Sequence, residues 1–267
     1  MPHDVVILIQ AREGSARYPG KVLAPFLGSP MLTYQVQRFQ RAGWRPQVLV
    51  PQGDLGLVAL QRGGIPVQQI RGDPADVLGR YARYARLMLT SGTVLVRACG
   101  DCPLLCPALL GALLTQWNAT PGLAYLGLGP GWPDGLADYD VFTREALLEW
   151  DAEATLPSDR EHVVPFCWRQ PDRYPQTLCL APTWLTEQTW PKLSVDTPAD
   201  LVYVEQVAQA VTTAYGAAYT WMDVLHVLAT TAALQRVPEA MNAAYTAQVA
   251  QEQGGVVQTW EAMRYRG

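Results

Sequence analysis

Long apolar runs and surplus positive charge are both missing from this 267-residue chain. No stretch reaches the ~18 consecutive apolar residues of a membrane-spanning helix, so we expect no membrane partner. The net charge of −4 argues against a general binder of nucleic acid or anionic membranes. Any site for an anionic ligand must therefore be local.

Lysine is also scarce in this sequence. Lysine occurs only at Lys21 and Lys192, so Lys21 is not a sample from a lysine-rich surface. The start of the chain lacks the basic segment of a signal peptide. Five cysteines, an odd number, fit a reducing cytoplasm better than a disulfide framework. We therefore expect a cytoplasmic protein.

What the chain does contain is an alternation of short apolar strands and helical patterns. The expected strands are Val5–Ile9, Gln47–Val50, Val67–Ile70 and Thr93–Ala98, with helices at Met31–Arg41 and from Arg71–Pro74 to about Thr90. This order predicts an α/β fold, a parallel sheet with helices on both faces. Such sheets bind ligands where strands end.

The loop after the first strand combines glycines with cations. Arg12, Arg17 and Lys21 are interleaved with Gly14, Ser15 and Gly20. Glycines let backbone N–H groups close on an anion that the cations neutralise, which suits a polyphosphate. The loop is neither a Walker loop nor a G-x-G-x-x-G dinucleotide loop.

The pattern Arg12-x-Gly14-Ser15-x-Arg17-x-Pro19-Gly20-Lys21 resembles the signature loop of the sugar cytidylyltransferases. It is most similar to the spore-coat polysaccharide biosynthesis group, relatives of the acylneuraminate and KDO cytidylyltransferases. The resemblance runs to about residue 210. It implies a three-layer, predominantly parallel nucleotide-diphospho-sugar transferase (GT-A-like) fold. It also implies transfer of CMP from CTP to a sugar or sugar-acid acceptor in surface polysaccharide or glycoconjugate biosynthesis, with release of pyrophosphate. Arg12, Gly14, Ser15, Arg17 and Lys21 would bind the triphosphate, with Arg12 and Lys21 stabilising the leaving charge.

Two aspartates are expected to hold Mg²⁺. Asp101 follows a buried strand in Gly100-Asp101-Cys102-Pro103-Leu104, where it either closes a turn or reaches a metal. A short strand is expected to end at Asp196, before a helix opened by Thr197-Pro198. The family has similar segments, so the resemblance implies that Asp101, also placed among the catalytic residues, and Asp196 are metal ligands.

Cys99, Cys102 and Cys106 have the close spacing of a metal cluster. We interpret them instead as buried free thiols, because Cys99 borders a strand and no fourth ligand is near in sequence.

Acceptor residues are expected in the second half. The family resembles Pro-Asp-Gly-Leu-Asp-x-Glu-Val-Phe where this chain has one extra residue, Ala137, so that Asp138 and Asp140 take the acidic positions. A similar Arg-Glu-His segment places Arg160, Glu161 and His162 at the acceptor. Ser158 and Glu161 also have the spacing of a helix capping box.

The remaining nucleotide contacts are expected after the third strand. There the family builds part of its base and ribose pocket, which implies contacts from Gly72, Asp73, Asp76 and Arg80.

One position departs from the family. Glu13 replaces a usually apolar residue, and a carboxylate beside a triphosphate opposes binding unless it points away or pairs with an arginine. Later in the chain, Asp54 is placed to cap a short helix that stops at Gly63-Gly64.

The chain is divided into a nucleotidyltransferase domain (1–215) and a helical C-terminal extension (216–267), with helices at Met222–Ala233 and Pro238–Gln251. This extension packs on the core, forms an oligomer contact such as a homodimer, or covers the acceptor pocket. Two other functions stay open: a glycosyltransferase using Asp138-Tyr139-Asp140 as a metal motif, and a non-catalytic nucleotide binder. A phosphonate or non-sugar alcohol acceptor also remains an alternative.

Overall fold

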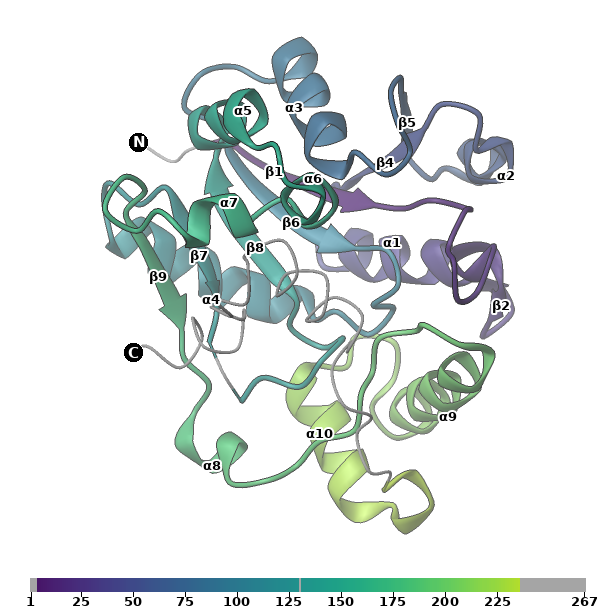
Figure 1. The fold of residues 1–267 in the computed structure, drawn as a ribbon. Helices are drawn as coiled ribbons and strands as arrows, with labels where there is room; N and C mark the ends of the chain where they lie inside the picture. Colours follow the sequence, from purple (N-terminus) through teal and green to yellow (C-terminus); the bar gives the residue numbers. More distant parts are fainter. Residues whose placement is uncertain (1–3, 130, 236–267) are drawn as a thin grey trace.

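A seven-stranded sheet forms the centre of the computed structural model, which describes residues 4–129 and 131–235 (Figure 1). The strand order is β5-β4-β1-β6-β8-β7-β9. The strands are β1 (Val5–Gln10), β4 (Gln47–Pro51), β5 (Val67–Ile70), β6 (Val94–Cys99), β7 (Tyr125–Leu128), β8 (Tyr139–Thr143) and β9 (Gln176–Cys179). A separate two-stranded ladder joins β2 (Pro25–Phe26) to β3 (Ser29–Pro30).

The sheet is predominantly parallel, as predicted. β1 pairs in parallel with β4 and β6, and β4 with β5. β8 runs antiparallel to both β6 and β7, while β7 and β9 are parallel. The start of β8 therefore lies at the edge where β1 and β6 end, which brings residues from both halves of the chain together.

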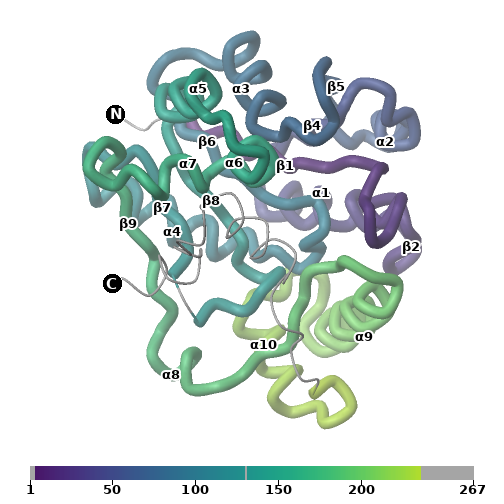
Figure 2. The backbone as a smooth tube through the Cα atoms, viewed as in Figure 1, coloured from purple at the N-terminus to yellow at the C-terminus, as the bar shows by residue number. Residues whose placement is uncertain are grey.

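Helices cover both faces of the sheet, giving three layers (Figures 1 and 2). The side chains of α3 and α5 join one buried cluster, and those of α1, α4, α9 and α10 join the other. The longer helices are α1 (Met31–Arg41), α3 (Val77–Met88), α4 (Pro107–Ala119), α5 (Arg144–Glu153), α9 (Pro198–Tyr215) and α10 (Trp221–Thr230). The short ones are α2 (Leu55–Ala59), α6 (Pro157–His162), α7 (Pro165–Trp168), α8 (Thr183–Thr186), η1 (Lys21–Leu23), η2 (Leu60–Gly63) and η3 (Ala232–Leu234).

Strand β1 is apolar because it is covered on both sides. Leu8 packs in the cluster with α3, whereas Ile7 and Ile9 pack in the cluster with α1. Parallel strands between two helical layers need such continuous apolar sequences. The predicted α/β architecture is confirmed.

Three local predictions are wrong. A helix does start where the spacing of Ser158 and Glu161 suggested, but Ser158 is not its N-cap, because α6 begins at Pro157 after the N-cap Leu156. No strand ends at Asp196; instead the Val195 N–H donates to the Asp101 carbonyl at 2.8 Å. The side chain of Asp54 makes no cap bond to α2, although Asp54 occupies the N-cap position.

Helix α3 begins later than the sequence suggested. Its N-cap is Asp76, whose carboxylate accepts from the Gly79 N–H at 2.9 Å. Residues 71–76 thus form a loop after β5. The Asp76 carboxylate suits the N-cap position because it accepts a hydrogen bond from a helix N–H that has no intrahelical partner.

The described part of the C-terminal segment packs on the core. The hydroxyl groups of Tyr219 and Tyr34 in α1 share a 2.8 Å hydrogen bond, and the guanidinium of Arg38 lies 3.8 Å from the ring centroid of Tyr219. The expected helix near Met222 is confirmed as α10, whereas Pro238–Gln251 lies outside the described residues. Within the described residues, no helix is long and apolar enough to cross a membrane.

Candidate functional site

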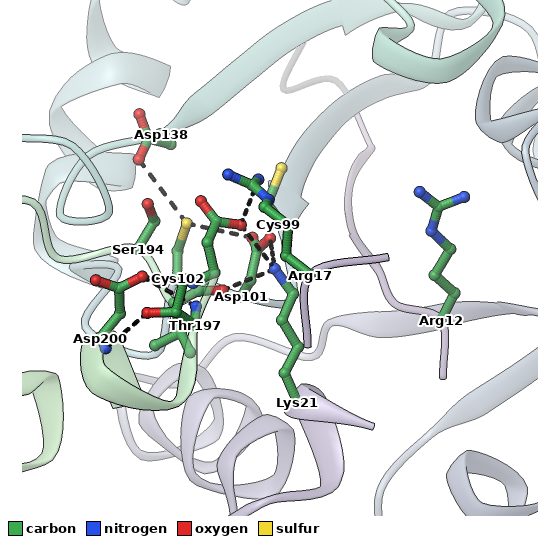
Figure 3. Close-up of polar contacts among 12 residues, drawn as sticks. Arg12, Arg17, Lys21, Cys99, Asp101, Cys102, Asp138, Ser194, Thr197 and Asp200 are labelled. Atoms are coloured by element: carbon green, nitrogen blue, oxygen red, sulfur yellow. Dashed lines mark hydrogen bonds and ion pairs between the residues drawn. The ribbon is translucent and has the colours of Figure 1, made fainter. Parts of the chain in front are cut away.

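The ammonium of Lys21 lies at the centre of a polar cluster (Figure 3). Its Nζ is 2.8 Å from Asp101 Oδ2, 3.1 Å from Asp196 Oδ1 and 2.7 Å from the Val195 carbonyl. Arg17 Nη2 adds a second contact to Asp196 Oδ1 at 2.8 Å. The structure therefore brings together four of the residues predicted from the sequence, across more than 170 positions of chain.

The close approach of β1 and β6 sets the position of Asp101. The Gly100 N–H donates to the Gln10 carbonyl at 2.9 Å, and a Cβ at Gly100 would lie 2.7 Å from that oxygen. Only glycine fits this contact without a backbone shift. The strand end thus holds Asp101 directly opposite the loop that carries Lys21.

Helix α9 sets the position of Asp196. Thr197 caps the helix by accepting from the Asp200 N–H, and Asp200 in turn accepts from the backbone N–H groups of Asp196 and Thr197. This reciprocal capping box orders the residues just before the helix. Asp196 is therefore held by its backbone as well as by its ion pairs.

Charge pairing outweighs burial at this cluster. Burial alone would lower the pKa of Lys21, but Asp101 and Asp196 raise it above its ordinary value. Burial would raise the pKa of Asp196, but Lys21 and Lys192 lower it. Lys21 and Asp196 therefore both keep their charge near neutral pH.

Arg12 lies apart from this cluster (Figure 3). Its Nη2 pairs with Glu161 Oε1 of α6 at 3.1 Å, and both side chains are about one third exposed. Gly14 is exposed and Ser15 half-buried between Arg12 and Arg17. The predicted loop therefore extends from the Lys21 cluster, through Arg17, to α6, through Arg12.

A second polar network contains Asp140, one of the two expected acceptor aspartates. Asp140 accepts from Arg97 Nη1 at 2.6 Å and from the Tyr125 hydroxyl at 2.7 Å, while Arg97 Nε donates to Gln10 Oε1 at 2.9 Å. Asp138 has other partners: the backbone N–H of Gly135 and the thiol of Cys102 at 3.9 Å. The two predicted acceptor aspartates thus belong to different networks.

His162 is uncharged in this environment. Burial lowers its pKa to about 3, and the positive charges of Arg97 and Arg12 contribute. It lies at the end of α6, next to Glu161. The acceptor side of the site therefore combines a neutral imidazole with two guanidinium groups.

Arg160 belongs to a different network of ion pairs. It pairs with Asp76 Oδ1 at 2.7 Å and with Asp151 Oδ1 at 2.6 Å, which ties α6 to α3 and α5. Arg80 is buried and donates to the Pro74 carbonyl at 2.6 Å. Among the residues expected to form a nucleoside pocket, Gly72 and Asp73 are exposed in the loop after β5.

Sequence reasoning missed three residues of the site: Arg97, Lys192 and Asp134. Lys192 pairs with Asp196 Oδ2 at 2.9 Å, and Asp134 accepts from the Ser194 N–H at 3.2 Å. Arg97 carried a signal, because a cation within an otherwise apolar strand needs a buried partner. Lys192 carried one too, as the second of only two lysines.

The donor set suits a hard divalent cation. Asp101 and Asp196 come from separate loops, and each places a carboxylate oxygen about 3 Å from one nitrogen. Mg²⁺ is usually held by one or two carboxylates together with phosphate oxygens and water. Within the described residues, here or elsewhere, no group of three or more His, Cys, Asp or Glu side chains could hold a metal ion, so the donor set consists of these two carboxylates.

A family model described as cytidylyltransferase matches residues 6–217. The chain belongs to the cytidylyltransferase family. The resemblance noted in the signature loop is thereby confirmed, since the match also contains Asp101 and Asp196.

Relatives of this cytidylyltransferase-family chain agree with that placement. The 3-deoxy-manno-octulosonate cytidylyltransferase of Acidovorax sp. (strain JS42) is 28% identical over 173 residues, covering 62% of this chain and 66% of that protein. The chain thus spans just under two thirds of this relative's length.

Solved structures show the same fold. A cytidylyltransferase from Leptospira borgpetersenii serovar Hardjo-bovis (strain JB197) superposes with a TM-score of 0.75 at 23% identity, covering 90% of this chain and 100% of that one. A CMP:2-keto-3-deoxy-manno-octonic acid synthetase complexed with CTP has a TM-score of 0.56 at 20% identity, covering 77% and 98%. The predicted nucleotide-sugar transferase type of fold is confirmed.

Proposed function

We propose that this protein transfers CMP from CTP to a hydroxyl of a sugar acid and releases pyrophosphate, with Mg²⁺ as cofactor. The observation that carries the proposal is the Lys21 cluster, in which a buried ammonium meets carboxylates from two separate loops. The curated relative named for 3-deoxy-manno-octulosonate supports a sugar-acid acceptor. The structural neighbour solved with CTP supports the nucleotide.

The cations of the first loop would bind and orient the triphosphate. Lys21 keeps its charge because neighbouring carboxylates raise its pKa. Arg17 and Arg12 each keep at least a third of their side chain exposed and each has one carboxylate partner, Asp196 and Glu161. Phosphate oxygens could replace those partners, since guanidinium binds phosphate and carboxylate in the same way.

Asp101 and Asp196 would hold Mg²⁺, which when bound neutralises phosphate charge. Transfer to an acceptor oxygen needs no covalent nucleophile from the protein. It needs alignment of the acceptor with the α-phosphorus and stabilisation of the departing charge. A site built of arginine, lysine and carboxylates, as found here, supplies both.

The acceptor would lie near Arg97, Arg12 and His162. A sugar acid carries a carboxylate, and a guanidinium group could bind it by exchanging its present carboxylate partner, which is Glu161 for Arg12 and Asp140 for Arg97. In the free protein His162 is a neutral imidazole at neutral pH, with one ring nitrogen that donates and one that accepts, so it would serve as a hydrogen-bonding partner of the acceptor.

The glycosyltransferase alternative is less well supported. Its metal motif would use Asp138 and Asp140 together, but both oxygens of Asp140 are occupied by Arg97 and Tyr125. That pairing leaves Asp140 poorly suited as a metal ligand. A phosphonate or other anionic alcohol remains an alternative acceptor, because the same cations would bind it.

Thermal unfolding with Mg²⁺ and CTP, UTP, GTP or ATP tests the nucleotide. A ligand that binds only the folded state raises the melting temperature. We expect a CTP-selective rise that needs Mg²⁺ and disappears in Lys21→Ala. A rise with a nucleotide-sugar and none with any triphosphate would favour the glycosyltransferase instead.

Pyrophosphate release then tests the acceptor. The panel consists of 3-deoxy-manno-octulosonate, an acylneuraminate, a neutral hexose and a hydroxyalkyl phosphonate, each with CTP and Mg²⁺. We expect release with a sugar acid. Release only with the phosphonate would keep the cytidylyl transfer and replace the acceptor.

A further inference from the structure

Glu13 connects the loop of Arg12, Arg17 and Lys21 to helix α2. Its backbone N–H donates to Asp54 Oδ2 at 2.9 Å, and its side-chain Oε1 accepts from the Leu57 N–H at 3.0 Å. Asp54 and Leu57 are the N-cap and third residue of α2. The carboxylate that departs from the family pattern is therefore bound at a helix terminus, where a negative charge is stabilised.

The two acidic residues have exchanged roles. The N-cap residue Asp54 makes no side-chain bond to its own helix, and Glu13 satisfies the helix N–H from a distant segment. Asp54 in turn satisfies the backbone of Glu13. This exchange has the logic of a capping box, but it joins two segments 41 to 44 residues apart. We call the pair of bonds the Glu13–Asp54 clasp.

The backbone carbonyl of Glu13 connects the clasp to the rest of the loop. It accepts from the Ser15 N–H at 2.9 Å and from the Gly20 N–H at 2.8 Å. Gly20 immediately precedes Lys21, and Arg12 immediately precedes Glu13. A shift of Glu13 would therefore displace the two cations that the family resemblance assigns to the triphosphate.

Gly56 of α2 lies directly beside the Glu13 carboxylate. A Cβ at that position would lie 2.9 Å from Glu13 Oε1 and 2.8 Å from Leu23 Cδ1. The glycine is not needed for its own backbone, since its φ lies outside the left-handed region. Its absence of a side chain admits the carboxylate.

We propose that Glu13, Asp54 and Gly56 are positioning residues for triphosphate binding: their contacts hold the loop of Arg12 and Lys21 in its binding geometry. The proposal rests on the proposed function, because it assumes that this loop binds the triphosphate. It also explains the carboxylate at position 13. The charge is directed to a helix N–H, so it supports the loop instead of opposing the ligand.

Calorimetric titration with CTP and with CMP, each with Mg²⁺, tests the proposal without any acceptor. CMP lacks the two outer phosphates, so loss of loop geometry should weaken CTP more than CMP. For Glu13→Ala and Gly56→Ala we expect a rise of about tenfold in the Kd of CTP, the size of one hydrogen bond to a charged group. For CMP we expect a change of less than about twofold.

Two further variants separate positioning from general stability. Glu13→Gln keeps an oxygen that can accept from Leu57, so it should restore most of the CTP affinity. Asp223→Ala removes a comparable cap at the start of α10, where Asp223 accepts from the Thr220 N–H at 2.7 Å. This control should lower the melting temperature about as much as Glu13→Ala and leave the Kd of CTP unchanged.

The outcomes distinguish this proposal from the function on which it rests. If the wild type binds CTP and Glu13→Ala binds it equally well, the clasp has no positioning role. An equal loss of CTP and CMP affinity, or of CTP affinity in Asp223→Ala, would show a purely structural effect and overturn the proposal. A wild type that binds no triphosphate would overturn the proposed function itself, and the role of the clasp with it.

Discussion

Replacing Lys21 with methionine would remove the ammonium that joins Asp101, Asp196 and the Val195 carbonyl. Methionine keeps a long unbranched side chain but supplies no hydrogen-bond donor. We expect a less stable protein that nevertheless gains affinity for divalent cations in the absence of nucleotide.

The stability loss follows from the burial of the three charges. The side chains of Lys21, Asp196 and Asp101 are 9%, 14% and 31% exposed. Removing one partner of a fully buried ion pair costs about 3–5 kcal/mol. Because Asp101 is partly solvated and Asp196 keeps Arg17 and Lys192, we expect about 2–3 kcal/mol here. The melting temperature should then fall by about 5–10 °C.

The loss should depend on pH. The pKa of Asp196 is lowered in the folded protein, mainly by Lys21 against the opposing effect of burial. Its stabilising contribution is therefore complete above the unfolded value of about 4 and disappears as the pH falls through the lower folded value. The wild type and the variant should converge in stability below about pH 4.

Cation affinity is the second measurement. Without the ammonium, Asp101 and Asp196 face each other with less compensating charge, so the variant should bind Mg²⁺ more tightly than the wild type. At ten times the Kd of the variant, Mg²⁺ should stabilise it by about 1.4 kcal/mol. Lys192→Met is the matched control. It also breaks a partly buried pair with Asp196 but leaves Lys21 between the carboxylates. Equal stability of wild type and Lys21→Met, or equal Mg²⁺ effects on both lysine variants, would refute the bridging role of Lys21.

Three further predictions concern single groups. His162, with a pKa of about 3, should show no imidazolium formation by NMR between pH 8 and pH 5. Because histidine in the unfolded chain titrates near 6.5, the burial of His162 should make the free energy of unfolding decline as the pH falls below about 6.5. A titration midpoint above pH 5 would contradict its burial. Gly100→Ala would place a Cβ 2.7 Å from the Gln10 carbonyl and should cost about 1–3 kcal/mol in urea unfolding; unchanged stability would show that the strands can separate. Thr197→Ala should cost about 1 kcal/mol through loss of the α9 cap, whereas an unchanged melting temperature would argue against that cap.

Local sequence signals were sufficient for the elements that depend on neighbouring residues. The apolar run Val5–Ile9 predicted β1 to within one residue, and the pattern Met31–Arg41 predicted α1 at both ends. Thr197-Pro198 correctly marked the start of α9. Each of these is governed by side-chain periodicity or by a cap within four residues, both of which are visible in the chain itself.

Long-range pairing decided the rest. Asp54 has the sequence of a helix cap, yet its carboxylate bonds to Glu13, and Glu13 caps the helix in its place. Val195 was expected in a strand, but its N–H donates to the Asp101 carbonyl and its carbonyl accepts from the Lys21 ammonium, and these two bonds do not make a ladder. No local pattern reports which of several acceptors a backbone N–H will meet after the chain folds.

The sequence by itself therefore determined the α/β class, the family and the loop of Arg12, Arg17 and Lys21. Only the tertiary structure decided that Lys21 and Arg17 share Asp196 while Arg12 pairs with Glu161. The physical reason is that residue type and spacing set local conformation, whereas the charge partners of a side chain depend on which strand ends and helix starts meet at the sheet edge.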